Sequence, residues 1–168
     1  MTPVAQSVPA ETIAEAIRGA GITHAVTVPD THQQTLLAAL NHEHEPAIVR
    51  AGTEDDVLGI CVGLWIAGMR PLAVIQQLGL FASVNALRWI RHEALTPLPI
   101  LAGMFGRDVN LAVDADPRSA VRLCPPLLDA LAIPWALVEG PQDVDAIEAA
   151  LGSTDPGPRV VLLGAPTS

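Results

Sequence analysis

Residues 53–87 read TEDDVLGICVGLWIAGMRPLAVIQQLGLFASVNAL, and they predict a helix, a buried strand and a second helix in direct succession. Thr53 to Gly68 opens with a capping threonine and three carboxylates and continues as an apolar run, which is typical of a helix. Pro71 to Ile75 is a short apolar run typical of a strand buried on both faces. Phe81 to Glu93 predicts the next helix. A buried strand between two helices favours a parallel sheet, because parallel strands need crossover connections.

The same alternation of helices and strands extends in both directions from this unit. Further helices are predicted over 9–21, 33–41, 119–131 and 144–151, the third interrupted by two prolines, and further strands over 22–28, 47–50, 98–102, 134–138 and 160–163. We therefore predict one α/β domain over residues 8–164, a flavodoxin-like, doubly wound parallel sheet with helices on both faces. Residues 1–7 and 165–168 are expected to be loose ends.

The composition limits the chemistry that the chain can perform. Its 168 residues are 50% hydrophobic, all nine basic residues are arginines, and lysine and tyrosine are absent. The absence of lysine excludes Schiff-base lysines and phosphate-loop lysines. A net charge of −9 with dispersed arginines argues against nucleic acid or an anionic membrane as a partner. Cys61 and Cys124 predict reduced core thiols, and without a basic leader or long apolar run we expect a cytoplasmic protein.

Ligands of open parallel sheets bind beyond the carboxyl ends of the strands. Four turns follow predicted strands and should meet at that edge: Pro29–His32, Ala51–Asp56, Gln76–Gly79 and Gly103–Asp108. The binding residues of this chain are therefore expected in these four turns.

The second turn carries three consecutive carboxylates, Glu54, Asp55 and Asp56. Acidic residues in a first helical turn are favoured by the helix dipole, which is one explanation for them. The helix behind them is apolar on every face and is expected to be buried. Such burial would draw at least one carboxylate into a low-dielectric site, where a carboxyl group can exchange protons near neutrality.

The third turn contains two amides and a glycine. Gln76 and Gln77 either offer neutral hydrogen-bond donors to a ligand or cap the following helix. Gly79 is expected to turn the chain tightly into that helix. The residue types alone leave both interpretations open.

The first and fourth turns also carry polar side chains with two interpretations each. Asp30, Thr31 and His32 are either ligand contacts or ordinary turn residues. Arg107 and Asp108 form either a salt-bridged turn or a clamp for an anion. No dinucleotide-binding glycine motif, phosphate loop, nucleophile elbow or zinc-protease motif is present in the sequence.

Residues 53–87 resemble the pyrimidine-binding domain of thiamine-diphosphate enzymes. Within that family they are most similar to the α subunit of sulfopyruvate decarboxylase and the N-terminal domain of phosphonopyruvate decarboxylase. The elements that carry the resemblance are Glu54 five residues before Gly59-Ile60-Cys61, the proline at the start of the strand, and Gly79-Leu80 followed by Asn85-Ala86-Leu87. The resemblance extends over residues 14–135.

The resemblance implies a cofactor and a role for the glutamate. At the position of Glu54, the family's glutamate hydrogen-bonds N1′ of the aminopyrimidine and promotes the imino tautomer that activates the thiazolium ring. Gln76, Gln77 and Gly79 fall where the family contacts this cofactor, thiamine diphosphate. The implied activity is decarboxylation of a 2-oxo acid.

The resemblance also implies substrate contacts. Thr31 stands where relatives often place a small hydroxyl near the substrate carboxylate, and Gln77 stands where some relatives carry a polar group that faces the reacting centre. Asp30, His32 and Arg107 are further candidate substrate contacts. Relatives usually carry Pro-Gln-His where this chain reads Asp-Pro-Arg-Ser at 116–119. This departure bears on the substrate rather than on the cofactor.

The family's diphosphate-binding motif, Gly-Asp-Gly followed by an asparagine, has no counterpart here, since the sequence contains no Gly-Asp-Gly. The resemblance therefore implies a β subunit that supplies this motif and the Mg²⁺ site, in a heterotetramer or larger heteromer that acts on a small anionic 2-oxo acid. The chain alone should carry no metal site, bind thiamine diphosphate poorly and lack decarboxylase activity. Two alternatives are a carboligase subunit with the same cofactor and a non-catalytic interaction or regulatory subunit.

Overall fold

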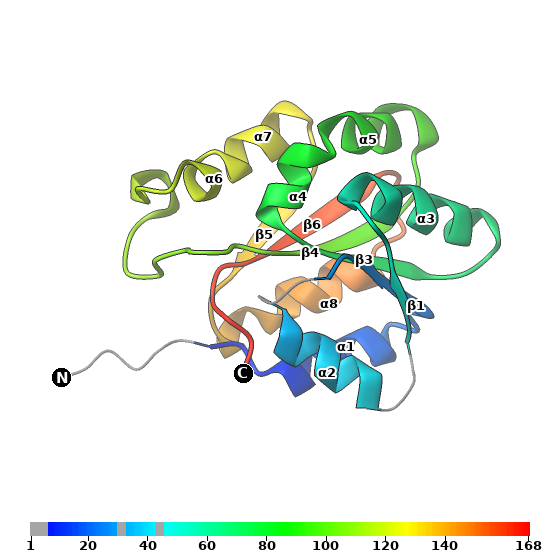
Figure 1. The fold of residues 1–168 in the computed structure, drawn as a ribbon, viewed down its shortest axis with the longest axis horizontal. Coiled ribbons are helices and arrows are strands. Elements are labelled where there is room, and N and C mark those ends of the chain that lie inside the picture. The colour runs from blue at the N-terminus through cyan, green and yellow to red at the C-terminus, as the bar shows by residue number, and fades with distance from the viewer. Residues whose placement is uncertain (1–6, 30–32, 43–45) are drawn as a thin grey trace.

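The computed structural model describes residues 7–29, 33–42 and 46–168, and it contains a six-stranded sheet in which all neighbouring strands are parallel (Figure 1). The strands are β1 (His24–Thr27), β2 (Ala47–Arg50), β3 (Pro71–Gln76), β4 (Leu98–Gly103), β5 (Trp135–Val138) and β6 (Pro158–Leu163). Their order across the sheet is β2-β1-β3-β4-β6-β5. The predicted doubly wound parallel sheet is confirmed.

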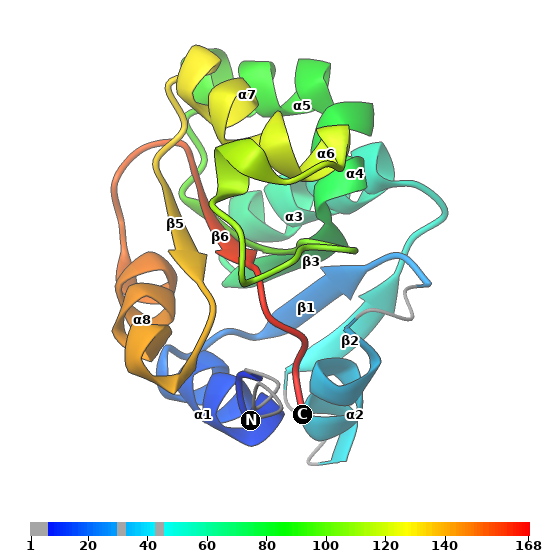
Figure 2. The ribbon, with the colours of Figure 1, turned by 90° about the vertical axis from the view of Figure 1, so that its left-hand side faces the viewer.

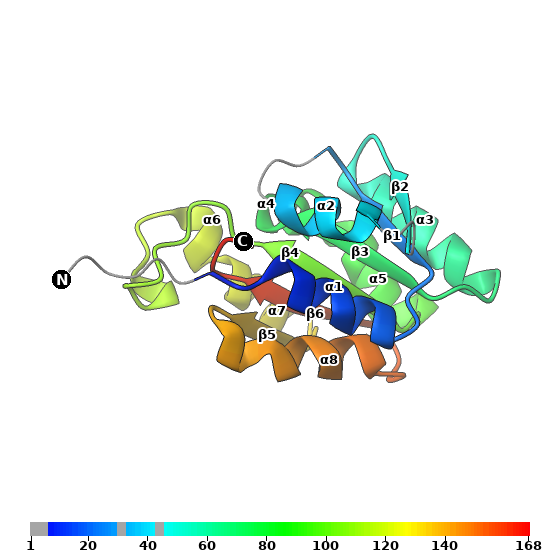
Figure 3. The ribbon, with the colours of Figure 1, turned by 90° about the horizontal axis from the view of Figure 1, so that it is seen from below.

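Helices cover both faces of the sheet (Figures 1 and 3). One face is covered by α1 (Ala10–Gly19), α2 (Gln34–His42) and α8 (Val144–Gly152). The other is covered by α3 (Glu54–Ile66), α4 (Gln77–Ala82), α5 (Val84–Trp89), the π-helical turn η1 (Ile90–Ala94), α6 (Ser119–Arg122) and α7 (Cys124–Ala130). Two 3-10 turns, η2 (Val113–Ala115) and η3 (Pro141–Asp143), lie in connections. None of the described helices is long and apolar enough to cross a membrane.

The core consists of two apolar clusters separated by the sheet. Side chains alternate between the faces of a strand, so Leu72 and Val74 pack against α1, α2 and α8, whereas Ala73 and Ile75 pack against α3, α4 and α5. This alternation explains why β3 is an uninterrupted apolar run in the sequence: both of its faces are buried.

The helix predicted over residues 81–93 begins earlier and is divided in three. Gln77 is the first residue of α4, so Gly79 lies inside a helix and the expected tight turn at this glycine is wrong. The helix predicted over residues 119–131, with an interruption at two prolines, is divided into α6 and α7. The division lies between Arg122 and Cys124, and the two prolines occupy the first turn of α7. Proline is tolerated there, since a first-turn N–H has no intrahelical partner.

The C-terminal segment is paired with the beginning of the described chain. The Val8 N–H donates to the Pro166 carbonyl at 3.1 Å, and the Ser168 N–H donates to the Val8 carbonyl at 3.1 Å. Val8 and Thr167 form a parallel bridge, and Ala165 is buried. Figure 2 shows this last segment running down beside α1 and α2. Residues 165–168 are thus held in place, contrary to the expectation that they are loose.

Candidate functional site

The topology places a switch point at the carboxyl ends of β1 and β3. These neighbouring strands are followed by helices on opposite faces, α2 after β1 and α4 after β3. Ligands of doubly wound sheets bind at such a switch point. The predicted contacts Asp30, Thr31 and His32 follow β1, but they lie outside the described residues.

Glu54 is brought to this edge by the cap of α3. The Thr53 hydroxyl accepts a hydrogen bond from the Asp56 N–H at 3.2 Å, which begins the helix and makes Glu54 its first residue. Asp55 and Asp56 are exposed, whereas Glu54 is half-buried. The Glu54 carboxylate has no hydrogen-bond or ion-pair partner among the residues that the structure describes. It is therefore available to a ligand.

Gly79 lies directly beneath the Glu54 side chain. A Cβ atom built on Gly79 would lie 2.4 Å from Glu54 Cγ and 3.1 Å from Glu54 Oε1. Atoms in real structures do not approach so closely without displacement of one of them. The missing side chain at position 79 is thus what lets the glutamate lie over the first turn of α4.

Gln77 is used inside the chain. It is 1% exposed, its Nε2 donates to the Phe105 carbonyl at 2.8 Å, and its Oε1 accepts from the Phe105 N–H at 2.8 Å. This paired contact ties the β3–α4 junction to the segment after β4. Gln76 is the half-buried end of β3, in register with Gly103. The two amides that looked alike in the sequence therefore have different surroundings.

Arg107 is buried and holds the loop after β4 together. Its side chain is 2% exposed, with Nη1 3.5 Å from Asp116 Oδ2 and Nε 2.9 Å from Glu139 Oε1. The Nε–H does not point at Glu139, so that contact is an ion pair rather than a hydrogen bond. Nη1 and Nη2 donate to the carbonyls of Asp108 and Leu111. Arg107 thus forms a salt-bridged loop, and its carboxylate partners are Glu139 and the buried Asp116 rather than Asp108.

Asp116 is a fully buried carboxylate that the sequence did not single out. Its two oxygens accept from the Asp108 N–H at 3.0 Å and the Arg118 N–H at 2.9 Å. The Asp108 N–H is the largest cause that lowers the pKa of Asp116 below its ordinary value, and the guanidinium groups of Arg118 and Arg107 add to it. Nothing in the sequence distinguished Asp116 from Asp108 as the anchor of this loop.

Arg118 carries the guanidinium that this loop presents to solvent. Its side chain is 55% exposed, and Nη1 lies 4.0 Å from Asp116 Oδ1. It lies over Gly106, whose φ is +82°, and a Cβ built there would be 2.6 Å from Arg118 Nε. Of Arg107 and Arg118, only Arg118 has a side chain that is accessible from solvent.

Gln33 is a second buried amide at this edge that the sequence did not indicate. It is 1% exposed, and its Nε2 donates to the carbonyl of Ile75, next to the end of β3. Its Oε1 is buried and has no partner within the described part of the chain. The sequence does not indicate this contact, because Gln33 and Ile75 are 42 positions apart and a polar residue at the start of a helix is ordinary.

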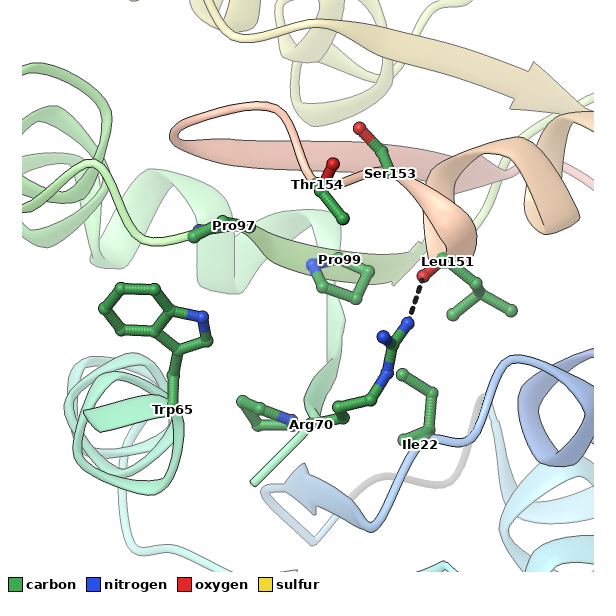
Figure 4. Close-up of a pocket in the computed structure, with 9 residues that line it drawn as sticks. Ile22, Trp65, Arg70, Pro97, Pro99, Leu151, Ser153 and Thr154 are labelled. Carbon is green, nitrogen blue, oxygen red and sulfur yellow. Dashed lines mark hydrogen bonds between the residues drawn. The ribbon is translucent and has the colours of Figure 1, made fainter. Parts of the chain in front are cut away.

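A separate cavity of about 90 Å³ lies at the opposite edge of the sheet (Figure 4). The residues around it lie at the starts of β1, β3 and β4 or at the ends of α3 and α8: Ile22, Trp65, Arg70, Pro71, Pro97, Pro99, Leu151, Ser153 and Thr154. Arg70 Nη2 donates to the Leu151 carbonyl at 3.4 Å across it. Because it lies at the amino ends of the strands, this cavity is not part of the candidate site.

Comparison with known proteins gives two relatives by sequence, although no family model matches the chain. The chain is 36% identical over 98 residues to sulfopyruvate decarboxylase of Methanosarcina acetivorans, covering 58% of this chain and 25% of that protein. It is 27% identical over 96 residues to sulfopyruvate decarboxylase subunit alpha of Methanococcus maripaludis, covering 57% and 58%. The matches therefore span a quarter and somewhat over half of the relatives' lengths.

Solved structures share the fold at low sequence identity. Benzoylformate decarboxylase from Polynucleobacter necessarius matches with a TM-score of 0.67 and 20% identity over 93% of this chain and 30% of that one. A 2-oxoglutarate:ferredoxin oxidoreductase from Magnetococcus marinus matches with a TM-score of 0.67 and 16% identity over 91% and 28%. The fold is that of the pyrimidine-binding domain of thiamine-diphosphate enzymes. By sequence, somewhat over half of the chain is similar to sulfopyruvate decarboxylases, as the resemblance predicted.

Proposed function

We propose that this chain is the pyrimidine-binding α subunit of a two-chain, thiamine-diphosphate-dependent 2-oxo acid decarboxylase. The observation that carries the proposal is the Glu54 carboxylate, which lies on Gly79 at the carboxyl edge of the sheet without a partner among the described residues. The names of the two sequence relatives support decarboxylation of a 2-oxo acid as the reaction.

The residues present fit the aminopyrimidine half of the cofactor. A partly buried carboxylate on a floor of main-chain atoms suits a flat heterocycle with a ring nitrogen to be hydrogen-bonded. Glu54 would hold and exchange the proton at N1′ of that ring. When bound, thiamine diphosphate supplies the electron sink for loss of CO₂. Gln76 and Gly79 remain proposed cofactor contacts, while Gln77 would act by fixing the β3–α4 junction.

The other half of the cofactor is assigned to a partner chain. The sequence lacks Gly-Asp-Gly, and no group of three or more His, Cys, Asp or Glu side chains in the described residues is arranged to hold a metal ion. We infer that a β subunit supplies the diphosphate and Mg²⁺ ligands, within a heterotetramer or larger assembly.

The outer face of α3 is an argument for the proposed β subunit. The helix was expected to be buried on every face, but in this chain only the side that includes Val57 and Cys61 is buried. One face of a sheet can cover only one side of a helix. The outer face of α3 is exposed, and Ile66 on it is 74% exposed. This face consists of Gly59, Gly63, Trp65 and Ile66. An exposed apolar face on the helix that begins at Glu54 is a suitable surface for the β subunit.

The substrate proposed is a small anionic 2-oxo acid. Its carboxylate would lie near Thr31, with Asp30 and His32 as neighbouring contacts. Arg118, exposed beside Gly106, is better placed than Arg107 to meet a second acidic group of the substrate.

Calorimetry and one conservative substitution test the proposal. The chain alone should bind thiamine diphosphate and Mg²⁺ weakly, and the complex with its β subunit should bind them tightly. In the complex, Glu54→Gln should reduce turnover by at least about 100-fold, because general acid–base catalysis contributes 10²–10⁴-fold. Asp55→Asn, an exposed neighbour, is the matched control and should change turnover little.

Other outcomes would contradict the proposal in identifiable ways. Tight cofactor binding by the chain alone would exclude the division of the site between two chains. Turnover unaffected by Glu54→Gln would favour a non-catalytic subunit. Release of CO₂ only when an acceptor aldehyde is supplied, with a condensation product and no simple aldehyde product, would assign carboligation rather than simple decarboxylation.

A further inference from the structure

We propose that Gly79 is a positioning residue that sets the location of the Glu54 carboxylate. The inference rests on the proposed role of Glu54 and adds to it a second residue that acts through the first. It assigns to Gly79 a function in holding the glutamate, beyond the contact with the cofactor that the sequence resemblance implied.

The contact between Gly79 and Glu54 is closer than any side chain at position 79 would allow. A Cβ there would lie 2.4 Å from Glu54 Cγ and 3.1 Å from both Cδ and Oε1. The atoms that would collide therefore include the middle of the side chain as well as its end. Even a methyl group would push the whole carboxylate away from α4.

The main chain at Gly79 is not free to yield instead. Its carbonyl accepts from the Ser83 N–H at 3.0 Å and from the Ser83 hydroxyl at 2.5 Å, and Ser83 is 1% exposed. On the other side, Gln77 is held by its two hydrogen bonds to Phe105. Since the backbone is fixed on both sides, Glu54 is the part that an added methyl group would move.

Backbone conformation does not explain the glycine. Gly79 lies within α4 and is not among the positive-φ residues. Alanine is normally the more favourable residue inside a helix. Gly59, in the interior of α3, has nothing within 4 Å of a built Cβ. Gly79 is buried and Gly59 is exposed, and of these two glycines only Gly79 has a side chain, that of Glu54, where its own Cβ would lie.

A double-mutant cycle on the chain alone tests the contact without cofactor or partner. Gly79→Ala should lower Tm by roughly 2–4 °C, the shift expected for about 1 kcal/mol at this chain length. In a Glu54→Ala background, which removes Cγ, the same substitution should no longer lower Tm. Gly59→Ala, the matched control, should not lower Tm in either background.

Each result of this double-mutant cycle either supports or overturns the proposed contact between Gly79 and Glu54. An equal loss of Tm in both backgrounds would overturn the proposal, because the collision would then involve other atoms. If Gly79→Ala prevents folding, recovery of the fold by Glu54→Ala supports the proposal, and failure to recover it counts against it.

Kinetics of the complex test the positioning role. Gly79→Ala should lower kcat by on the order of 100-fold, the effect of about 1 Å of misplacement, and leave the substrate KM nearly unchanged. Added to Glu54→Gln, it should cause little further loss. Full activity of Gly79→Ala beside an inactive Glu54→Gln would overturn this inference alone. Activity unaffected by Glu54→Gln would overturn the proposed function, while the thermal cycle would still report on the contact.

Discussion

At the scale of single residues, the carboxyl edge of the sheet is built from glycines that lie beneath charged side chains. The pairs are Gly79 beneath Glu54, Gly106 beneath Arg118 and Gly164 beneath Glu139. Each glycine follows a different strand, β3, β4 or β6. A Cβ on any of them would lie within 2.7 Å of a charged side chain. The main chain therefore forms the floor on which these three charged groups lie.

Asp116 should make the stability of the chain depend on pH. Its pKa is lower in the folded chain than its ordinary value, so its contribution is fully present above about pH 4 and is lost as the pH falls through the lowered pKa. Asp116→Asn should cost about 3 kcal/mol at pH 7, because it leaves Arg107 buried with one partner fewer. Urea unfolding at a series of pH values measures this cost.

The difference in unfolding free energy between wild type and Asp116→Asn should narrow as the pH falls below 4. Asp114→Asn, in the same loop without these contacts, serves as the control and should change stability by less than about 0.5 kcal/mol. A difference that stays constant down to pH 2 would contradict the assignment of Asp116.

The two cysteines should be inert in the folded chain. Cys61 and Cys124 are free and buried, and burial raises the pKa of each thiol to about 12. Because the thiolate is the reactive form, a chromogenic disulfide at pH 8 should modify neither thiol in the native chain. The same reagent in denaturant should modify both. Rapid modification of one native thiol would show that its side chain opens to solvent.

Some site residues could be predicted from the sequence and others could not. The difference is whether the partners of a residue are close to it in the sequence. Glu54 was indicated by its position in the first turn of an apolar helix and by the family resemblance. Asp116 and Gln33 act through partners far away in the chain or through main-chain groups, which a sequence does not display. Arg107 does form ion pairs, but with Asp116 and Glu139 rather than with Asp108, the neighbour with which the sequence paired it.

At the scale of elements, α3 has two unlike sides. Val57, Leu58, Cys61 and Val62 face the sheet, and the outer face of α3 is exposed. The helix looked uniformly apolar in the sequence because both sides consist of apolar or small residues. Sequence hydropathy predicted burial on every face, which is wrong for the outer face, because hydropathy alone does not say which side of a helix the chain itself covers.

A charge on the outer face of α3 should separate folding from assembly. Ile66→Lys should leave the unfolding free energy of the chain within about 0.5 kcal/mol, since Ile66 is 74% exposed. It should weaken binding of the β subunit by roughly 2 kcal/mol, about 30-fold, if this face is buried in the complex. Sedimentation or calorimetry with the two chains measures the affinity.

Leu123→Lys is the matched control, because Leu123 is an exposed apolar residue between α6 and α7, outside α3. It should leave the affinity for the β subunit unchanged. Equal affinities of the Ile66 variant and wild type would place the interface on another surface.

The β3–α4 junction shows why one boundary was misplaced. Glycine is a signal for a turn, so Gly79 was expected to separate strand from helix. In the structure β3 ends at Gln76 and α4 begins at Gln77, with no residue between them. The glycine there serves a contact with α3, and such a tertiary requirement overrides local preference.

At the scale of the whole molecule, the alternation of apolar runs and amphipathic segments was sufficient to predict the class of fold. Each strand is short and apolar because helices cover both faces, and each crossover is long enough to be read as a helix. The strand order β2-β1-β3-β4-β6-β5 was not predicted. It depends on which face each crossover takes, and a helix that buries an apolar stripe packs on either face.

The pairing of Val8 with Thr167 has a consequence for protein engineering. Since these residues are neighbours beside α1 and α2, a few glycines would be enough to join the two ends of the described chain. A circular permutant could then be opened in the polar loop near Asn110, which is exposed. In such a molecule the new ends would leave the loop after β4, so a fluorescent label attached there would report on events at the carboxyl edge of the sheet.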